Sequence, residues 1–272
     1  MLPSAPACPW GTKRTLRPNE PVREPRDGQP ARMGFVTSNP PSSASDSHAK
    51  GLVIAIDGPS GAGKSTIGRA LADALSYTYL DTGAMYRAVA VHVLGENIAV
   101  DDPEALARAA ASIVISFDET GKRVLLDGRD VTDEIRTREA TRAASAVAKT
   151  GAVRREMVRR QQELGRAGGV VLDGRDIGSV VFPHADVKFY LDAAPEKRAR
   201  RRFEESQGQE ASYEAILEDI RARDHQDMSR EDSPLVRVPD AVYVDTTEMT
   251  PDEVIARLLS DVEARIEGEP GQ

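Results

Sequence analysis

The feature that most constrains the fold is a short glycine-rich segment between an apolar run and a helical pattern. Residues 58–65 read Gly-Pro-Ser-Gly-Ala-Gly-Lys-Ser, which fits the pattern G-x-x-x-x-G-K-[ST]. The apolar run 52–56 predicts a buried strand, and apolar residues at helical spacing follow from Ile67 to Leu75. A strand, a glycine loop and a helix aim successive backbone N–H groups and the positive end of a helix dipole at one place. This arrangement favours a polyphosphate ligand.

An ordinary glycine-rich turn before a helix is the alternative interpretation of these residues. Lys64 argues against it, because a lysine beside several glycines does nothing for folding but would neutralise the β- and γ-phosphates of a nucleotide. Ser65 would supply a hydroxyl to Mg²⁺, and Thr66 would face the nucleotide. The predicted nucleotide-binding loop consists of Gly58, Pro59, Ser60, Gly61, Ala62, Gly63, Lys64, Ser65 and Thr66.

Composition restricts the class of protein. The chain has 272 residues, one cysteine and a formal charge of −8. A single cysteine excludes an internal disulfide framework and a multi-cysteine metal site, and it fits a reducing cytosol, so we expect a cytoplasmic protein. No stretch approaches the ~18 apolar residues of a membrane span, and the acidic balance argues against nucleic acid. The acidic balance does not argue against a small anionic substrate, since local arginines can outweigh the global charge. We expect a monomer.

Residues 1–50 differ from the rest of the chain. They hold 9 of the 17 prolines, and their seven Lys/Arg and four Asp/Glu give a charge of +3, which leaves −11 for the remainder. With no periodic apolar pattern, such a segment cannot bury enough apolar area to offset its ordering entropy, and we predict a disordered extension. It lacks the apolar core of a secretory signal. A transit peptide and a later start, at Met33 or beyond, stay open.

After residue 51, predicted strands and helices alternate. This alternation predicts an α/β domain with a parallel sheet and helices on both faces. A hairpin over 113–126 does not belong to that sheet and predicts a small insertion beside the substrate pocket. The last helix is predicted to begin with a capping box and a proline in its first turn, formed by Thr250, Pro251 and Glu253. The predicted strands are 52–56, one ending near Leu80, 169–173, 187–191 and 241–244; the predicted later helices are 83–94, 103–111, 137–148, 152–167, 195–205, 212–228 and 250–266.

The tetrapeptide Asp-Gly-Arg-Asp occurs twice, at 127–130 and at 173–176. The first copy follows a hairpin strand and predicts a turn. The second follows a buried strand whose carboxyl end points to the same edge as the glycine loop, where ligands bind in such sheets. Asp173 is therefore a candidate Mg²⁺-holding carboxylate, usually acting through water, with a helix cap or turn as the alternative. Arg175 and Asp176 would face an acceptor pocket, or else pair with each other.

The remaining arginines carry weaker signals. Arg87, Arg154, Arg223 and Arg230 are scattered, and on composition alone each would be a solvated surface residue. The dense run at 198–202 is usually a solvated helix face. Beside a phosphate-binding loop, it also fits a lid that brings positive charge onto a transferring phosphoryl group.

With these pieces assembled, the chain resembles the bacterial cytidylate kinases over residues 51–266. The glycine loop occurs in many kinases, but the other motifs in this order are specific to that family. The stretches that carry the resemblance are 56–66, Leu80-Asp81-Thr82-Gly83-Ala84-Met85-Tyr86-Arg87, 134–137, Asp173-Gly174-Arg175-Asp176-Ile177-Gly178, Val181-Phe182-Pro183 and Arg223-Asp224-His225-Gln226-Asp227.

The resemblance implies a P-loop kinase fold with a five-stranded parallel sheet flanked by helices, an enlarged monophosphate-binding insert and a small lid. It implies a core of about 51–96 and 141–266, an insert of about 97–140, a lid of about 195–210 and a frayed tail, 267–272. The implied activity is transfer of the γ-phosphoryl group of ATP to CMP or dCMP, with Mg²⁺ as the ion.

The resemblance also implies roles for particular residues. Arg87, Arg175 and Arg230 would hold the CMP phosphate, and Arg223 and Asp227 the sugar hydroxyls. The implied cytosine readers are Ser145, Arg154 and Asp176, with Thr82 close by, although Arg155 could replace Arg154. The candidate catalytic residues are Lys64, Arg87, Arg175, Arg230 and Asp173. The candidate metal ligands are Ser65 and Asp173. The candidate lid contacts to ATP are Arg198 and Arg202.

Small departures from the family pattern occur at Ser65, Thr82 and His225-Gln226. Two other functions stay open at this point. One is another small-molecule or nucleotide kinase on the same scaffold, and the other is a nucleotide-dependent regulatory switch. A guanine-reading switch would need an Asn-Lys-x-Asp segment, which the sequence lacks.

Overall fold

The computed structural model describes residues 51–118, 121–205 and 211–268. These residues belong to one structural unit, His48–Gln272. The predicted disordered extension 1–50, the end of the predicted lid (206–210) and most of the predicted tail (269–272) lie outside the described residues.

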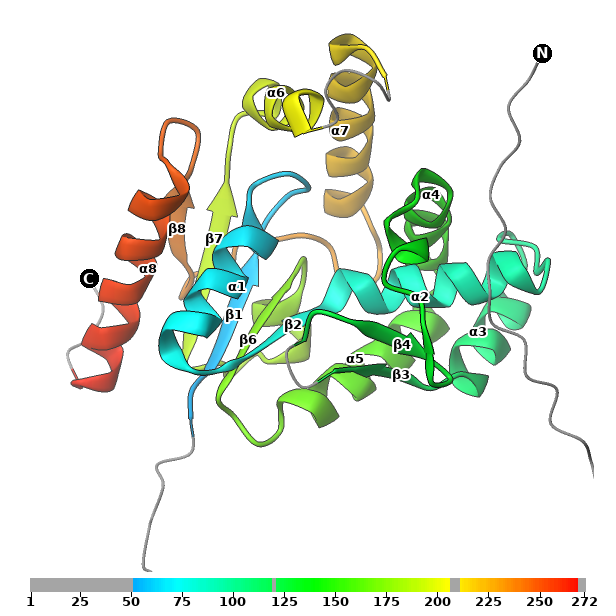
Figure 1. Cartoon of the computed structure of the whole chain (residues 1–272), viewed down its shortest axis with the longest axis horizontal. Helices are drawn as coiled ribbons and strands as arrows, with labels where there is room; N and C mark the ends of the chain where they lie inside the picture. The colour runs from blue at the N-terminus through cyan, green and yellow to red at the C-terminus, as the bar shows by residue number, and fades with distance from the viewer. Residues whose placement is uncertain (1–50, 119–120, 206–210, 269–272) are drawn as a thin grey trace, which may run out of the picture. The chain divides into compact units, whose positions relative to one another are not determined.

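A five-stranded parallel sheet forms the centre of the described unit (Figure 1). Its spatial order is β2-β6-β1-β7-β8, so β1, which leads into the glycine loop, has a partner on each side. The register sets Asp173 of β6 beside both Ile56 of β1 and Asp81 of β2. Asp57 of β1 pairs with Gly174, so acidic residues of β1, β2 and β6 lie near one another at the carboxyl ends of these strands. The strands are β1 (Val53–Asp57), β2 (Thr78–Asp81), β6 (Val170–Gly174), β7 (Val187–Asp192) and β8 (Val242–Asp245).

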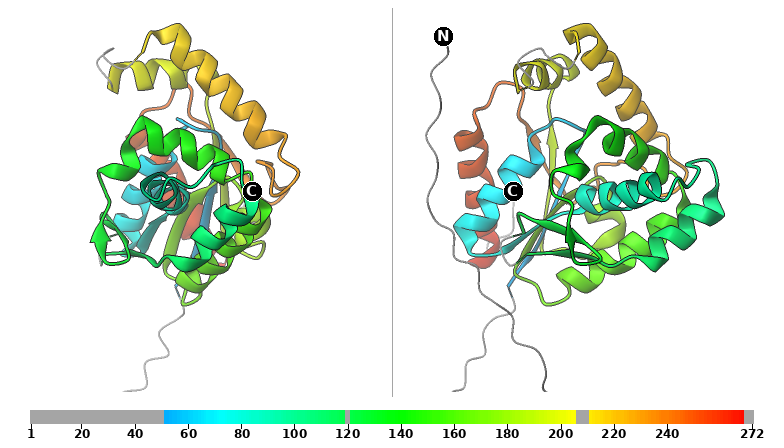
Figure 2. Two further views of the ribbon diagram at one scale, coloured as in Figure 1. Left: turned by 90° about the vertical axis from the view of Figure 1, so that its right-hand side faces the viewer. Right: turned by 45° about the vertical axis from the view of Figure 1, so that its right-hand side comes forward.

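Helices cover both faces of this sheet (Figure 2), which confirms the predicted fold class. Ile54 and Ile56 of β1 pack with α1 (Lys64–Leu75) and α8 (Pro251–Ile266). Ala55 points to the opposite face, where the π-helical turn η2 (Ile177–Val181) and α5 (Gly151–Gly165) contribute to the core. Near-continuous apolar strands such as β1 are what a sheet buried on both faces requires.

The start of α8 follows its sequence signal. The Thr250 Oγ1 accepts a hydrogen bond from the Glu253 backbone N–H at 3.3 Å, and the Glu253 carboxylate accepts one from the Thr250 N–H at 2.8 Å. With Pro251 at the first helical position, the predicted capping box is confirmed.

A second hydrophobic cluster lies beside the sheet and joins five helices to a small antiparallel sheet. Its members run from Ala84 to Met157 along the chain. The predicted hairpin is confirmed, but a third strand, β5, was not predicted. Asp127 and Gly128 adopt left-handed conformations (φ 50° and 80°) and make the predicted turn, after which Arg129 and Asp130 pair back onto β4. The elements are α2 (Thr82–Gly95), α3 (Pro103–Ser112), β3 (Ile115–Phe117), β4 (Val124–Leu126), β5 (Arg129–Asp130), η1 (Glu134–Arg136), α4 (Arg138–Val147) and α5.

Two further helices, α6 (Pro195–Glu205) and α7 (Tyr213–Met228), lie beyond the carboxyl ends of the strands (Figure 1). They pack on each other through Ala199, Ile216 and Ile220. Both helices match the predicted ranges to within a residue. Among the described residues, every helix is too short or too polar to cross a bilayer.

Candidate active site

The glycine loop adopts a backbone that only glycine accommodates easily. Gly58, Gly61 and Gly63 have φ values of 146°, 80° and 89°. A side chain at Gly58 would also place its Cβ only 1.9 Å from the Leu191 carbonyl oxygen of β7. Gly63 is the N-cap residue of α1 and offers no side-chain acceptor to the first turn of that helix. The N–H groups of that turn therefore suit an anion.

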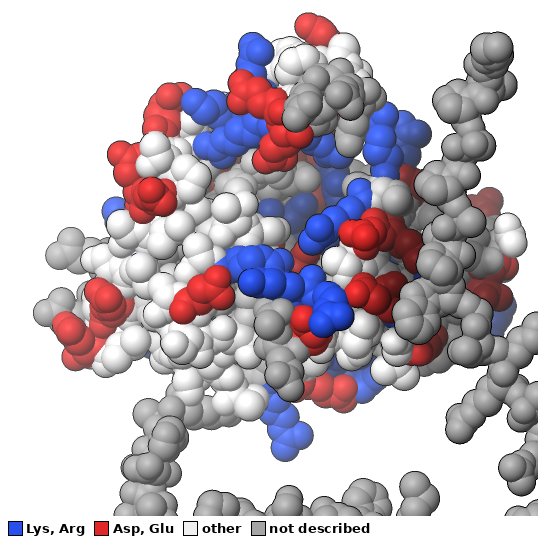
Figure 3. Space-filling view, viewed as in Figure 1, with Lys and Arg blue, Asp and Glu red and all other residues white. Residues whose placement is uncertain are grey.

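One cavity of about 730 Å³ opens at this edge of the sheet, and Figure 3 shows basic side chains around the hollow beneath α6 and α7. Apart from Gly58 and Pro59, which are not part of its wall, every predicted site residue lines it. These residues are Ser60, Gly61, Ala62, Gly63, Lys64, Ser65, Thr66, Thr82, Arg87, Ser145, Arg154, Asp173, Arg175, Asp176, Arg198, Arg202, Arg223, Asp227 and Arg230.

Lys64 is buried in the wall of the cavity. Its Nζ donates a hydrogen bond to the Pro59 carbonyl oxygen at 2.7 Å. Burial, and next the positive charge of Arg175, lower the pKa of Lys64 to about 7. A desolvated ammonium beside another cation gains strongly from an incoming anion, which suits Lys64 to a phosphate group.

Asp173 stands at the end of β6 with both carboxylate oxygens engaged. The Ser65 hydroxyl donates to Oδ2 and the Tyr79 hydroxyl donates to Oδ1, each at 2.8 Å. Burial, and then the charge of Asp81, raise the pKa of Asp173. A hydroxyl and a carboxylate are oxygen ligands of the kind Mg²⁺ takes in phosphoryl-transfer sites, so the residues present fit that ion. Among the described residues, no group of three or more His, Cys, Asp or Glu side chains is placed to hold a metal ion, so most ligands of a bound Mg²⁺ would be water or phosphate oxygens.

Positive charge is concentrated in the part of the cavity wall that contains Arg87, Arg175, Arg223 and Arg230. Asp227 accepts a hydrogen bond from Arg175 Nε at 2.8 Å and lies 3.6 Å from Arg230 NH1, while Asp81 accepts one from Arg87 at 2.7 Å. The Arg230 Nε and NH2 atoms are buried and have no hydrogen-bond partner among the described residues. Burial, and then the charge of Arg175, lower the pKa of Arg223 to about 10. These guanidinium groups outnumber their carboxylates, so the wall fits an anionic ligand.

A buried ion pair lies in the same part of the cavity. Arg154 NH2 donates to Asp176 Oδ2 at 2.5 Å, and the two side chains are only 4% and 8% exposed. The alternative that Arg175 and Asp176 pair with each other is wrong, because Arg175 turns to Asp227 and Asp176 to Arg154. Arg154 lines the cavity, whereas Arg155 is absent from its wall. This placement favours Arg154 over Arg155 as the residue near a ligand.

The sequence did not indicate several residues at this site. Thr246, Met249, Pro251 and Val254, from the end of β8 and the start of α8, line the cavity beside the glycine loop. Such apolar and small polar side chains carry no sequence signal of their own, since only the parallel sheet brings them to the loop.

Asp57 is a further residue without a predicted role. It is 6% exposed, and its carboxylate accepts hydrogen bonds from the backbone N–H groups of Ile177 and Gly178 at 2.8 and 2.7 Å. Burial raises the pKa of Asp57 to about 6, although these two hydrogen bonds oppose the rise. Asp57 therefore ties the start of the glycine loop to the turn that carries Arg175 and Asp176. In the sequence, only its position directly before Gly58 indicated that Asp57 could belong to the site.

The chain is similar to known proteins over most of its length. The family model for cytidylate kinase matches residues 54–264. A cytidylate kinase of Bacillus pumilus is 49% identical over 222 residues, which cover 80% of this chain and 98% of that protein. A cytidylate kinase of Bacillus subtilis is 47% identical over 220 residues, which cover 79% and 98%. Among solved structures, a shikimate kinase from Bacteroides thetaiotaomicron aligns with a TM-score of 0.41 and 15% identity, over 78% of this chain and 98% of that one. The chain belongs to the cytidylate kinase family.

Proposed function

We propose that the protein transfers the γ-phosphoryl group of ATP to CMP or dCMP, giving ADP and CDP or dCDP. The observation that carries this proposal is that one cavity joins the glycine loop and Lys64 to a buried Arg154–Asp176 pair and a group of arginines. The first part suits a triphosphate, and the second suits a nucleoside monophosphate.

The Arg154–Asp176 pair supports cytosine as the base. Cytosine offers an amino donor at N4 and acceptors at N3 and O2, so a carboxylate facing N4 and a guanidinium facing N3 or O2 complement it. Uracil would turn its O4 acceptor toward the negative charge of Asp176. A mismatch that leaves buried polar groups unpaired can discriminate by up to ~10⁴-fold.

The arginines suit the phosphate and the sugar of the acceptor. Arg87, Arg175 and Arg230 would hold the CMP phosphate, and Arg223 and Asp227 the sugar hydroxyls. Ser145 and Thr82 would complete the base pocket. CMP and dCMP differ by one hydroxyl, so we expect only modest selectivity between them.

The reaction needs no covalent intermediate. An oxygen of the CMP phosphate is already an anion and can attack the γ-phosphorus of ATP in line. The protein's part is to position the two nucleotides, neutralise charge through the loop N–H groups and Lys64, and exclude water. Ser65 and Asp173 would hold Mg²⁺, which supplies further neutralisation of the phosphate charge when bound.

Release of ADP in a coupled assay tests the proposal against other kinase activities. Purified protein is given ATP and, in turn, CMP, dCMP, UMP, AMP and GMP. We expect rapid turnover with CMP and dCMP, and a kcat/KM for UMP at least ~100-fold lower, because of the mismatch at Asp176. Turnover with another acceptor that equals or exceeds that with CMP would overturn the assignment.

A further inference from the structure

Arg198 of α6 uses most of its guanidinium on the protein itself. It is 3% exposed. Its Nε donates to the Ala193 carbonyl oxygen at 2.8 Å, and its NH1 donates to the Ser60 carbonyl oxygen at 3.0 Å. NH1 and NH2 also donate to the two carboxylate oxygens of Asp224, at 3.1 and 2.6 Å. These bonds engage Nε, NH1 and NH2, so the guanidinium has little donor capacity left for the predicted contact to ATP.

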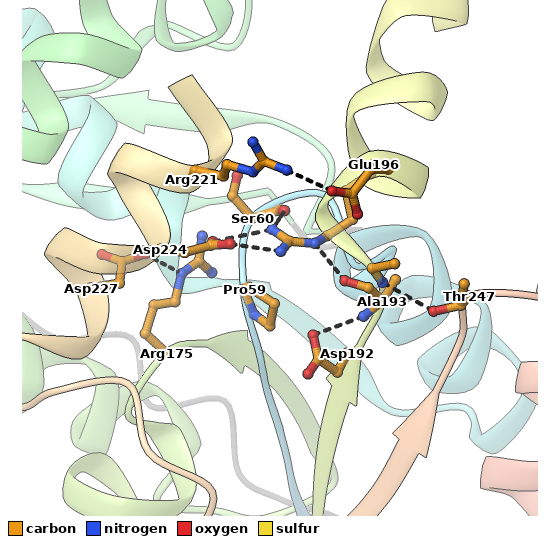
Figure 4. Close-up of polar contacts among 12 residues, drawn as sticks. Pro59, Ser60, Arg175, Asp192, Ala193, Glu196, Arg221, Asp224, Asp227 and Thr247 are labelled. Atoms are coloured by element: carbon orange, nitrogen blue, oxygen red, sulfur yellow. Dashed lines mark hydrogen bonds and ion pairs between the residues drawn. The ribbon is translucent and has the colours of Figure 1, made fainter. Parts of the chain in front are cut away.

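Two acceptors of Arg198 belong to different parts of the site, the glycine loop and helix α7. Ser60 lies inside the glycine loop, and a Cβ on the neighbouring Gly61 would come within 3.2 Å of the Arg198 Cβ. Asp224 lies on α7, directly after Arg223 and one turn before Asp227, whose carboxylate accepts from Arg175. Figure 4 shows Asp224 and Asp227 on the same helix, α7, with a dashed line from Asp227 to Arg175. Polar contacts thus join Ser60 of the glycine loop to Asp224 through Arg198, and the backbone of α7 connects Asp224 to Asp227, which accepts from Arg175.

We infer that Arg198 is a positioning residue that couples the two nucleotide sites, holding α7 against the glycine loop through Asp224 so that ATP and CMP strengthen each other's binding. The inference rests on the proposed function, because it needs ATP on the loop and CMP on α7.

The physical basis is the ordering of α7. A nucleotide that fixes the glycine loop also fixes the Ser60 carbonyl, and a buried bidentate Arg–Asp pair transmits that position because its geometry tolerates little displacement. The second nucleotide then binds a helix whose Arg223 and Asp227 are already in place, so less ordering opposes its binding. Because coupling between sites is reciprocal, CMP should strengthen ATP binding by the same factor.

The same two helices provide a matched control. Arg221 NH2 of α7 donates to Glu196 Oε1 of α6 at 2.7 Å, but the two side chains are 55% and 54% exposed. This pair joins α6 to α7, and among the described residues neither side chain hydrogen-bonds to the glycine loop. Exposed pairs of this kind contribute little to stability. Its loss should leave the coupling unchanged.

Isothermal titration of CMP, alone and with the magnesium complex of the β,γ-imido analogue of ATP, tests the inference. We expect the analogue to tighten CMP binding by about 5-fold or more in the wild-type protein, which is the lower end of typical coupling. In Arg198→Met, and equally in Asp224→Asn, the ratio of the two CMP affinities should fall close to 1. The double variant should lose nothing further, and Glu196→Gln should behave as the wild type.

Three outcomes would overturn the inference. One is a wild-type CMP affinity that does not change with the analogue. Another is a ratio that survives in Arg198→Met or in Asp224→Asn. The third is weak analogue binding in Arg198→Met beside an unaltered Asp224→Asn, which would make Arg198 a direct ligand of ATP. Asp224→Asn keeps the side-chain volume, so it carries the test even if Arg198→Met fails to fold. A wild-type protein that binds no CMP at all would instead refute the proposed function.

Discussion

At the scale of single residues, Lys64 has a proposed role in the reaction, and its buried charge does not stabilise the fold. Burial and the charge of Arg175 lower the pKa of Lys64 to about 7. The charged form of Lys64 therefore does not contribute to the free energy of unfolding. We expect Lys64→Ala to lower kcat at least ~100-fold, because neutralisation of the phosphoryl group is lost. The melting temperature should stay the same or rise, because a buried ammonium is removed. Steady-state kinetics and thermal unfolding check both, and near wild-type turnover would refute the role.

In the proposed function, base selection depends on Asp176. Replacing Asp176 with Asn keeps the shape of the side chain but removes the negative charge that would face the base. In Asp176→Asn, we expect the preference for CMP over UMP in kcat/KM to fall by at least ~10-fold. Asp130, in the other Asp-Gly-Arg-Asp copy, is exposed on β5 and gives the control Asp130→Asn. An unchanged CMP:UMP ratio in Asp176→Asn would remove Asp176 as a base reader.

Asp57 predicts a particular pH dependence of stability. In the folded protein, the Asp57 carboxyl group has a pKa of about 6, whereas the ordinary pKa of an aspartate is 3.8. The contribution of this group to the free energy of unfolding is therefore greatest below pH 3.8 and is lost as the pH rises through 6. Asp57→Asn does not titrate. Between pH 5 and 7.5, the wild type should lose about 1 kcal/mol relative to the variant, measured by urea unfolding. A difference that stays constant, or moves toward the wild type, would contradict this.

The sequence predicted those site residues that belong to local motifs. Lys64 is read from its loop and Asp173 from the strand before it, because neighbours along the chain determine their surroundings. Tyr79 and Asp224 gave no such signal. Tyr79 matters because strand register sets it beside Asp173, and Asp224 because helix packing places it on Arg198. Such partners are fixed only in the folded chain, so the sequence suggested a lid contact to ATP for Arg198 and missed its ion pair.

At the scale of elements, the glycine loop depends on close packing against β7. Gly58 has a φ of 146°, and an added Cβ would lie 1.9 Å from the Leu191 carbonyl oxygen, so the loop or the strand must shift in Gly58→Ala. We expect ATP affinity to fall at least ~10-fold and the free energy of unfolding to fall by about 2 kcal/mol or more. Calorimetry and urea unfolding measure the two effects.

Gly128 supplies the matched control for this variant. It also has a left-handed φ, 80°, but nothing lies within 4 Å of an added Cβ. Gly128→Ala should lower stability by about 1 kcal/mol and leave ATP affinity unchanged. Equal losses of ATP affinity in both variants would show that backbone strain, rather than contact with β7, accounts for the Gly58 effect.

The elements themselves were largely predictable, since each carries its own periodicity and end signals. The capping residues Thr250 and Glu253 marked the start of α8, and the apolar run at 187–191 marked β7. The strand β5 was missed because two polar residues, Arg129 and Asp130, form it only by pairing with β4. The limits of the monophosphate-binding insert, 97–140, stay a prediction, because the hydrophobic cluster in that region extends from Ala84 to Met157.

At the scale of the whole molecule, a chain of net charge −8 presents an arginine-lined cavity. Binding of CMP should therefore depend on local electrostatics that salt screens. We expect the KM for CMP to rise several-fold between 50 and 300 mM KCl. The affinity for cytidine, which has no phosphate, should change little over the same range. An equal response of the two would contradict a charged acceptor site.

The identity of the product distinguishes phosphoryl transfer to CMP from hydrolysis of ATP. The protein is incubated with ATP, CMP and Mg²⁺, and the nucleotides and inorganic phosphate are quantified by ³¹P NMR. We expect equal amounts of ADP and CDP, with inorganic phosphate at the level of a protein-free control. ADP accompanied by inorganic phosphate in place of CDP would show hydrolysis rather than transfer and would contradict the proposed function.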